Sequence, residues 1–454
     1  MKPKSLTLFF LLGLLLGCSK EISVTSNQVK GSESPLYSLN GKEHLVEFQA
    51  LYRSSYTQTK DIDIETLTSE IKRTAQFLFG PLTYRSLGGI QKGEKIQVLA
   101  DQAYVQNERV IIPYYYQATW LLRAEAIDEN NFQLPLPYSI PDLRTAQWKR
   151  CTDSGEGHNT WDFFWYYWEP GRYGCDHRLG EQYQMISVKV GAETPQTQLS
   201  FPEYKRLIHD ENGEPTLAMT FAFGYIEDTF PPNPFHDSDY GMTQFQNFYA
   251  RVKSQLSALG YTEQPIYQKD VSSGASVIGS QFTGMKENVR VRVSVVAAAG
   301  VDQMELFAHS YAKKHEGFFA WFGHSRVGSG FDADRFAAKL RYNPQEFSLT
   351  ADYQLVYWAG CNSYSYYTLP FFELKAKMNP ESDPSGTRNL DLISNVLPSL
   401  FSFNDYNAQV LFQALLNWNT PTSYQKIVSQ IEKYANMSGT KVIVNVLGDE
   451  DNPK

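Results

Sequence analysis

The chain of 454 residues is predicted to contain a three-layer α/β domain that follows a β-rich N-terminal domain. From residue 216 onward, short apolar runs alternate with amphipathic stretches, and this alternation is typical of a parallel sheet covered by helices. Before residue 208, strand-like runs dominate. Between the two parts lies a polar segment, residues 209–215, with Gly213 and Pro215, which marks the predicted boundary. The predicted domains therefore cover residues 37–208 and 216–450.

The N-terminal domain is expected to hold one helix and several strands. The helix covers residues 64–79, because Leu67, Ile71, Ala75 and Leu78 recur on one face, and Gly80 is its expected stop. Runs rich in β-branched and aromatic residues follow it. They predict strands at residues 95–99, 109–116, 119–124 and 185–190.

The second domain is expected to alternate regularly between strands and helices. Its predicted strands are residues 216–226, 289–298, 317–323, 353–360, 390–396 and 442–447. Its predicted helices are residues 243–259, 302–315 with Asp302 as cap, 332–341, 407–416 and 423–435. The acidic, Pro-rich segment 227–239 follows the first of these strands and is interpreted either as a wall of a substrate cleft or as a solvated loop.

The first residues have the pattern of an export signal. Lys2 and Lys4 precede an apolar stretch, residues 6–17, that is too short to span a bilayer. The sequence Leu15-Leu16-Gly17-Cys18 resembles the lipobox of bacterial lipoproteins. That resemblance implies a signal peptide at residues 1–17, a lipid on Cys18 and, with Ser19 next, attachment to the outer membrane. An ordinary secretory signal with a chance cysteine is the alternative. Residues 18–36 are polar and predict a flexible tether.

Charge and cysteine content restrict the function classes. The net charge of −8 gives no electrostatic basis for a nucleic-acid partner. In an oxidising envelope, Cys151 and Cys175 are expected to form a disulfide, and Cys361 is then the odd thiol. A zinc site is the alternative for this part of the chain. Its ligands would be drawn from Cys151, His158, Cys175, Asp176 and His177.

Two similar strands end in a histidine and a cysteine. Residues 317–323 run into His324, and residues 353–360 run into Cys361. The segment between them is long enough for a crossover between parallel strands, so both residues are expected at the carboxyl edge of the sheet. A histidine beside a cysteine can act as base and nucleophile. The backbone N–H groups of Ser325 and Cys361 are then the expected oxyanion donors.

These two motifs resemble the signature of the caspase-like cysteine peptidases, a group that includes gingipains, clostripain-like enzymes and separases. Phe318-Phe-Ala-Trp-Phe-Gly-His324 and Leu355-Val-Tyr-Trp-Ala-Gly-Cys361 are similar to the two strands of that signature, in the same order. The resemblance implies a caspase-like three-layer α/β fold over residues 216–450 and hydrolysis of a peptide or protein substrate. It implies no cofactor and no catalytic metal. The family has a glycine after the histidine, where this chain has Ser325.

Two other segments of the sequence allow a different interpretation of the function. Residues 322–328 partly match the Gly-x-Ser-x-Gly elbow of α/β-hydrolases, but Val327 occupies the place of the second glycine and no histidine follows His324. That interpretation therefore fails. The aromatic run at residues 161–168 is expected to be a strand whose alternate rings fill the N-terminal core. Exposure of one of its faces would instead indicate a non-catalytic envelope lipoprotein that binds glycan or protein through its N-terminal domain.

Overall fold

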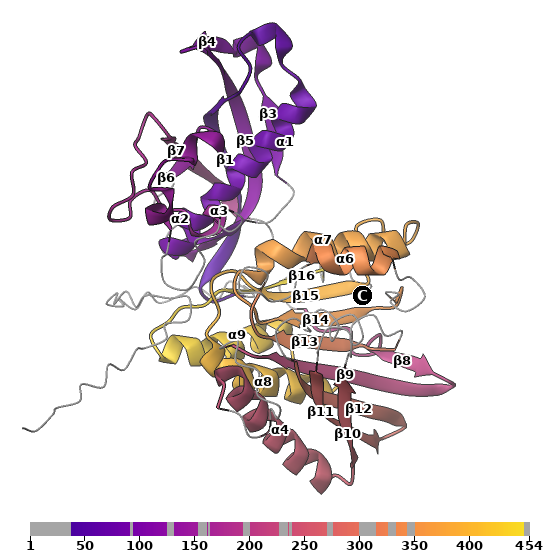
Figure 1. The fold of residues 1–454 in the computed structure, drawn as a ribbon. Coiled ribbons are helices and arrows are strands. Elements are labelled where there is room, and N and C mark those ends of the chain that lie inside the picture. The colour runs from indigo at the N-terminus through magenta and orange to yellow at the C-terminus, as the bar shows by residue number, and fades with distance from the viewer. Residues whose placement is uncertain are drawn as a thin grey trace, which may run out of the picture.

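The chain forms two β-sheets with helices packed on them in this computed structural model (Figure 1). The structure describes residues 38–90, 94–124, 131–152, 161, 164–193, 200–226, 235, 238–269, 276–298, 315–325, 333–342 and 350–448. The predicted signal peptide, Cys18, the tether and all but the last residue of the helix expected at 302–315 lie outside these ranges. Among the described residues, no helix is both long enough and apolar enough to cross a membrane. Because the chain contains both helices and sheets, its fold is of mixed α/β class, as predicted.

The first sheet is antiparallel and uses residues 41–193. Its strands are β1 (Gly41–Arg53), β2 (Gly88–Ile90), β3 (Lys95–Val98), β4 (Tyr104–Gln106), β5 (Arg109–Arg123), β6 (Asn131–Pro137) and β7 (Tyr183–Glu193). They pair in the order β2-β5-β1-β7-β6, and β3 and β4 also pair with β5. The sequence predicted two strands at residues 109–124. A single strand forms instead, because β5 pairs continuously with β1 from residue 111 to residue 123.

Helix α1 (Ile64–Ala75) begins at Asp63, whose carboxylate accepts a hydrogen bond from the Glu65 N–H at 3.1 Å. The chain continues through a 3-10 turn, η2 (Gln76–Leu78), into α2 (Phe79–Tyr84). The predicted helix stop at Gly80 is therefore wrong. A Cβ atom at Gly80 would lie 1.9 Å from the carbonyl oxygen of Trp168, so this glycine permits close packing rather than a turn.

The second sheet uses residues 208–447. Its strands are β8 (Ile208–Glu211), β9 (Glu214–Gly224), β10 (Thr262–Lys269), β11 (Ser276–Lys286), β12 (Val289–Ala298), β13 (Phe318–Phe322), β14 (Gln354–Trp358), β15 (Leu390–Asn395) and β16 (Val444–Leu447). They follow the order β10-β11-β12-β9-β13-β14-β15-β16, with β8 paired to β9. The segment expected as a domain boundary, residues 209–215, thus lies within the β8–β9 hairpin of this sheet.

Five neighbouring strands of this sheet, from β12 through β9, β13 and β14 to β15, are parallel. In chain order they are arranged 2-1-3-4-5, which is one of the two common orders of doubly wound sheets. The order reverses between β9 and β13, and ligands of such sheets bind where the carboxyl ends of the strands meet this reversal. His324 follows β13 directly after Gly323 and therefore lies at this place.

Helices cover both faces of the parallel strands (Figure 1). Helices α4 (Tyr240–Ala258), α8 (Asn404–Leu416) and α9 (Tyr424–Met437) lie on one face, and α6 (Ala333–Tyr342) and α7 (Ser363–Met378) lie on the other. Strand residues alternate between two cores. Phe318, Ala320 and Phe322 belong to the core under α4 and α8, whereas Phe319 and Trp321 belong to the core under α7. Burial on both faces explains why these strands read as continuous apolar runs.

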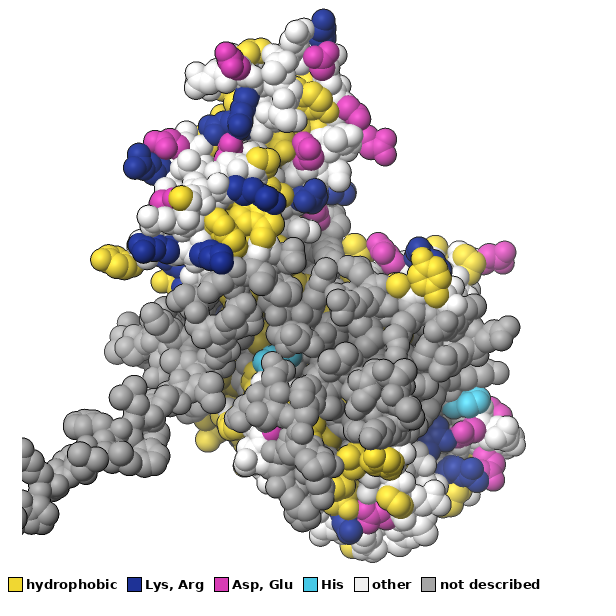
Figure 2. Space-filling view, in the orientation of Figure 1, with side chains coloured by type: hydrophobic (Ala, Val, Ile, Leu, Met, Phe, Trp, Pro, Cys, Tyr) yellow, Lys and Arg dark blue, Asp and Glu magenta, His cyan; other side chains and the backbone are white. Residues whose placement is uncertain are grey.

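The two sheets share the core that lies under α7. That core includes Val46 and Phe48 of β1 together with Trp358 of β14. The Tyr364 hydroxyl also donates a 2.8 Å hydrogen bond to Glu43 of β1. The N-terminal sheet thus supports the first turn of α7. On the face shown in Figure 2, acidic and basic side chains are interspersed over this sheet, as expected of a chain with 41 Lys and Arg and 49 Asp and Glu residues.

Candidate active site

The carboxyl ends of β13 and β14 bring the predicted base and nucleophile to neighbouring positions. The strands are parallel, and Trp321 lies opposite Trp358. The ladder continues beyond this pair, since the Ala359 N–H donates to the Trp321 carbonyl at 2.8 Å. β13 ends at Phe322 and β14 at Trp358, so His324 and Cys361 follow the carboxyl ends of two neighbouring parallel strands. A Cβ atom at Gly360 would lie 3.3 Å from the Gly323 carbonyl oxygen, so the residues directly before His324 and Cys361 pack against each other.

Close packing of backbone at this edge explains the glycines that precede both residues. A Cβ atom at Gly323 would lie 2.6 Å from the Trp321 ring. A Cβ atom at Gly360 would lie 3.2 Å from the Cβ of Ser325 and 3.3 Å from the Ser325 nitrogen. Ser325 therefore packs against Gly360, the residue that precedes Cys361. The backbone segments that carry the two predicted oxyanion donors lie close together. The Ser325 side chain is only 3% exposed.

His324 is held by a backbone carbonyl of the neighbouring strand. Its Nε2 lies 2.9 Å from the carbonyl oxygen of Ile226, which follows β9. Because a carbonyl oxygen only accepts hydrogen bonds, Nε2 must carry the proton and Nδ1 is the basic nitrogen of the neutral ring. The Phe401 ring packs edge-on against the imidazole at 5.2 Å. The Trp321 indole N–H donates to the His324 carbonyl at 3.0 Å and fixes the backbone.

Cys361 lies at a sharp turn from strand to helix. The next residue, Asn362, has φ 51° and ψ 28° and is the N-cap of α7. Its side chain is held on both sides, because Oδ1 accepts from the Tyr166 hydroxyl and Nδ2 donates to the Val396 carbonyl at 2.9 Å. A left-handed non-glycine residue that is fixed in this way is a strained feature of the kind that clusters at functional sites. A cysteine at a helix N-terminus is also in a position that favours its thiolate.

A segment that follows β15 covers the pair in this structure. The Cys361 sulfur lies 3.9 Å from the Ser399 hydroxyl oxygen, and the cysteine is 5% exposed. The Leu397 carbonyl accepts from the Asn362 N–H, and Phe401 contacts His324. We name residues 396–403 the cover segment. Because it buries the thiol, Cys361 does not lie in an open cleft.

Sequence reasoning found the two strand-end residues and missed their surroundings. Ile226 binds His324 through its backbone carbonyl. Every residue type has this group, so the sequence does not identify the residue that uses it. Phe401 and Ser399 reach the pair only through tertiary packing. Helix α7 was missed because the run from Tyr364 to Thr368 is aromatic and β-branched and Pro370 follows it, and both features argue against a helix. Of the segment 227–239, the described Phe235 packs on Phe245 and Tyr249 of α4.

The predicted disulfide between Cys151 and Cys175 is confirmed. It lies beside His177, so three possible zinc ligands are within 4.8 Å of one another. Both nitrogens of His177 are already used, since Nδ1 accepts from the Trp168 indole at 3.0 Å and Nε2 donates to the Leu143 carbonyl. Burial lowers the pKa of His177 and keeps the ring neutral. The described residues therefore favour the disulfide over zinc. His158 lies outside the described residues.

Removal of this disulfide is expected to destabilise the protein by about 3 kcal/mol, because the unfolded chain regains the freedom of a closed loop of 24 residues. The measurement is urea unfolding of the Cys151→Ser/Cys175→Ser variant against wild type. Dithiothreitol should lower the stability of wild type and leave the double variant unchanged. Equal stability of the two proteins without reductant would contradict the expectation.

Part of the aromatic run at residues 161–168 is a short helix, α3 (Phe164–Tyr167), and not the predicted strand. Phe164 and Trp168 are four residues apart, so both reach the ring of Phe77 at 5.7 Å, edge to face. Phe164, Tyr166 and Trp168 are buried, as the core interpretation required, and Trp165 and Tyr167 between them are half-buried.

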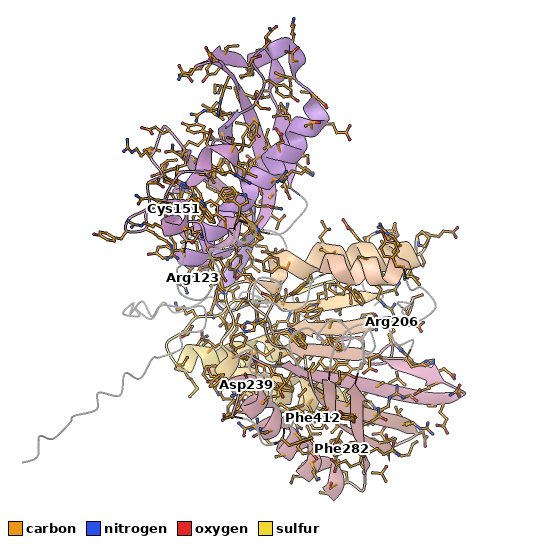
Figure 3. The ribbon with its side chains drawn as sticks, in the orientation of Figure 1. Arg123, Cys151, Arg206, Asp239, Phe282 and Phe412 are labelled. Carbon is orange, nitrogen blue, oxygen red and sulfur yellow. A yellow bond between two sulfur atoms is a disulfide. The ribbon has the colours of Figure 1, made fainter. Side chains whose placement is uncertain are left out.

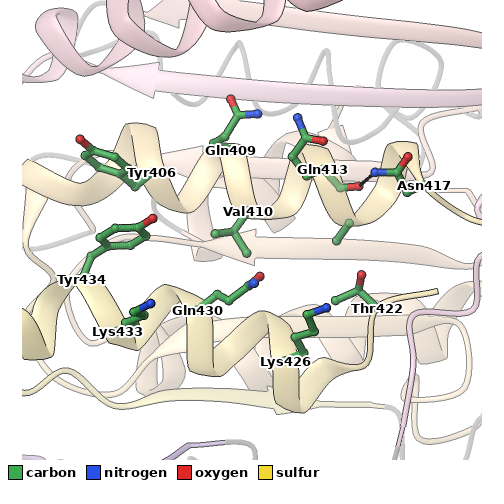
Figure 4. A pocket seen from close by; sticks show the side chains of 11 residues that line it. Tyr406, Gln409, Val410, Gln413, Asn417, Thr422, Lys426, Gln430, Lys433 and Tyr434 are labelled. Atoms are coloured by element: carbon green, nitrogen blue, oxygen red, sulfur yellow. Dashed lines mark hydrogen bonds between the residues drawn. The ribbon is translucent and has the colours of Figure 1, made fainter. Parts of the chain in front are cut away.

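A groove of about 350 Å³ lies between α8 and α9 (Figure 4). Its lining includes Tyr406 and Tyr434, whose rings stack at 4.7 Å. Neither His324 nor Cys361 lines it. The groove is therefore separate from the strand-end pair.

No protein-family model, curated protein or solved structure matches this chain.

Proposed function

We propose that this protein is a cysteine peptidase of the caspase-like type, anchored to the outer membrane through a lipid on Cys18. The observation that supports the proposal is that His324 and Cys361 follow the carboxyl ends of β13 and β14, two neighbouring parallel strands beside the point where the strand order of the sheet reverses. Two similar strand sequences that end in a base and a nucleophile have a direct catalytic use at such a position. The substrate is a peptide or protein, and the chemistry needs no cofactor.

The arrangement supports a balanced acyl-transfer mechanism. Nδ1 of His324 takes the proton of the Cys361 thiol, and the thiolate attacks the carbonyl carbon of the peptide bond. The N–H groups of Ser325 and Cys361 stabilise the oxyanion that develops. The imidazolium then gives its proton to the leaving amine. Water activated by the same ring hydrolyses the thioester, which releases the acid and restores the thiol.

The sheet supports the proposal of a caspase-like three-layer domain. Helices pack on both faces of the parallel strands, and the His and Cys strands are neighbours joined by a crossover that includes α6. The last strand, β16, is antiparallel to β15 and closes that edge. The buried thiol requires one further step, which is displacement of the cover segment before a substrate can reach Cys361.

The burial of Cys361 also favours a second candidate function. At 5% exposure, with Ser399 against the sulfur, the residue fits a structural cysteine in a non-catalytic envelope lipoprotein. Such a protein would bind glycan or protein through its N-terminal domain. The two candidates differ in the state of the thiol, which can be measured without knowledge of the substrate.

The test is the rate of Cys361 alkylation by iodoacetamide between pH 5 and 9. Opening of the cover segment changes the alkylation rate by the same factor at every pH. The midpoint of the pH profile therefore reports the pKa of the Cys361 thiol. In wild type the midpoint is expected well below the ordinary thiol pKa of about 8.5, and in His324→Ala it should return toward that value. His315→Ala, just before the other end of β13, is the matched control and should behave as wild type. A profile that is indifferent to His324 would overturn the peptidase proposal and support the structural role.

A further inference from the structure

Asp239 is a buried carboxylate beside the strand-end pair that the mechanism above does not use. It is 1% exposed and is the N-cap of α4 (Figure 3). The sequence assigned it only to the end of an acidic segment. Its contacts, however, connect the start of α4 with the residue that binds His324.

The Asp239 carboxylate serves two different partners. Oδ1 accepts from the Met242 N–H at 3.1 Å, which is an ordinary helix N-cap. The Ile226 N–H lies 3.0 Å from Oδ2 and 3.2 Å from Oδ1. Capping needs a single oxygen, so the hydrogen bond from the Ile226 N–H to Oδ2 goes beyond capping and holds the backbone of Ile226.

Ile226 is thereby held at both of its backbone polar groups. Its N–H donates to Asp239, and its carbonyl accepts from Nε2 of His324. The start of α4 is itself fixed on the end of β9, because a Cβ atom at Gly241 would lie 2.1 Å from the Gly224 carbonyl oxygen. The carboxylate thus ties a rigid helix start to the carbonyl that orients the imidazole.

We infer that Asp239 is a positioning residue for His324, acting through the backbone of Ile226. By fixing the Ile226 carbonyl, it keeps the proton on Nε2 and leaves Nδ1 as the basic nitrogen on the side of Cys361. The catalytic role of this positioning rests on the proposed function. The orientation of the His324 ring by Asp239 and Ile226 does not depend on it.

Two substitutions separate positioning from helix capping. Asp239→Ser keeps a hydroxyl that can cap α4, since serine is as good an N-cap as aspartate, but it is too short to hold Ile226 as well. Asp239→Asn keeps the capping oxygen and replaces Oδ2, the nearer acceptor of the Ile226 N–H at 3.0 Å, with an N–H₂ group that cannot accept, so that only the 3.2 Å contact with the capping oxygen can remain. Asp63→Ser is the matched control, because Asp63 caps α1 through the Glu65 N–H, in a helix that packs on the other sheet.

The experiment measures the ring nitrogens of His324 by ¹⁵N NMR at pH 9 in the Cys361→Ala background, where no thiolate holds the ring in its imidazolium form, and the alkylation of Cys361 at pH 6 in proteins that keep the thiol. With Asp239 unchanged, and with Asp63→Ser, the ring should show the Nε2–H tautomer, whereas both Asp239 variants should show a mixture of tautomers. Alkylation at pH 6 should fall about tenfold in the Asp239 variants alone. An unchanged tautomer in a folded Asp239 variant would overturn the inference.

The two proposals fail in different ways. If wild-type alkylation does not depend on His324, the proposed function is wrong, and the NMR comparison still decides whether Asp239 positions the ring. If alkylation depends on His324 and is unaffected by either Asp239 substitution, the positioning role alone is wrong. Should Asp239→Ser fail to fold, Asp239→Asn carries both readouts.

Discussion

Cys361→Ala is expected to abolish peptide-bond hydrolysis, with a loss of at least about 10³-fold in rate, because it removes the sulfur that forms the acyl intermediate. Cys361→Ser should be nearly as inactive, since His324 cannot activate a hydroxyl as readily as a thiol. The measurement is cleavage of a denatured, carboxymethylated protein, followed by the appearance of new amino termini.

The control for this experiment is Cys151→Ser/Cys175→Ser, which removes the disulfide and keeps Cys361. It should retain hydrolysis at temperatures where it stays folded. Cleavage at the wild-type rate by folded Cys361→Ala would show that the activity resides elsewhere or in a contaminant, and the proposed mechanism would then be wrong.

Lys375→Met is expected to lower stability by about 1–3 kcal/mol at pH 10, where the lysine is neutral in the folded protein. Lys375 in α7 is fully buried, and its Nζ donates to the carbonyls of Thr350 at 2.9 Å and Asp352 at 2.7 Å. Methionine fills much of the same volume but donates nothing, so the buried Thr350 carbonyl loses its partner, whereas water can replace the lysine at the exposed Asp352. Lys377→Met, an exposed position of the same helix, is the matched control and should change stability by less than about 0.5 kcal/mol.

The effect of Lys375 should also depend on pH. Burial lowers its pKa to about 7 from the usual 10.5. Between these values the unfolded chain binds more protons than the folded protein, so the free energy of unfolding rises with pH by up to about 1.4 kcal/mol per unit. The cost of Lys375→Met should therefore grow from pH 7 to pH 10. Burial raises the pKa of Glu432 to about 7, and that group acts over the separate range between about pH 4.5 and 7. Urea unfolding of both proteins at several pH values checks this, and a cost that does not vary with pH would contradict it.

The sequence by itself determined the local elements and the residue types of the candidate site. Short apolar runs located β9, β12, β13, β14 and β15, and helical periodicity located α4 and α9. His324 and Cys361 were identifiable because each ends a strand whose sequence is unusual. The Cys151–Cys175 disulfide followed from the number of cysteines left for pairing. All of these signals lie in residue type and short-range spacing.

Only the tertiary structure decided what surrounds that pair. The pairing of β13 with β14 brought the ends of the His324 and Cys361 strands to the same edge, and a backbone carbonyl of Ile226, held by Asp239, oriented the ring. The Ser399 hydroxyl of the cover segment lies against the Cys361 sulfur, and helix α3 fixed Asn362 through Tyr166. These contacts join residues that are 13 to 196 positions apart in the chain. Several of them use backbone groups, which every residue carries, so no pattern of side chains could have revealed them.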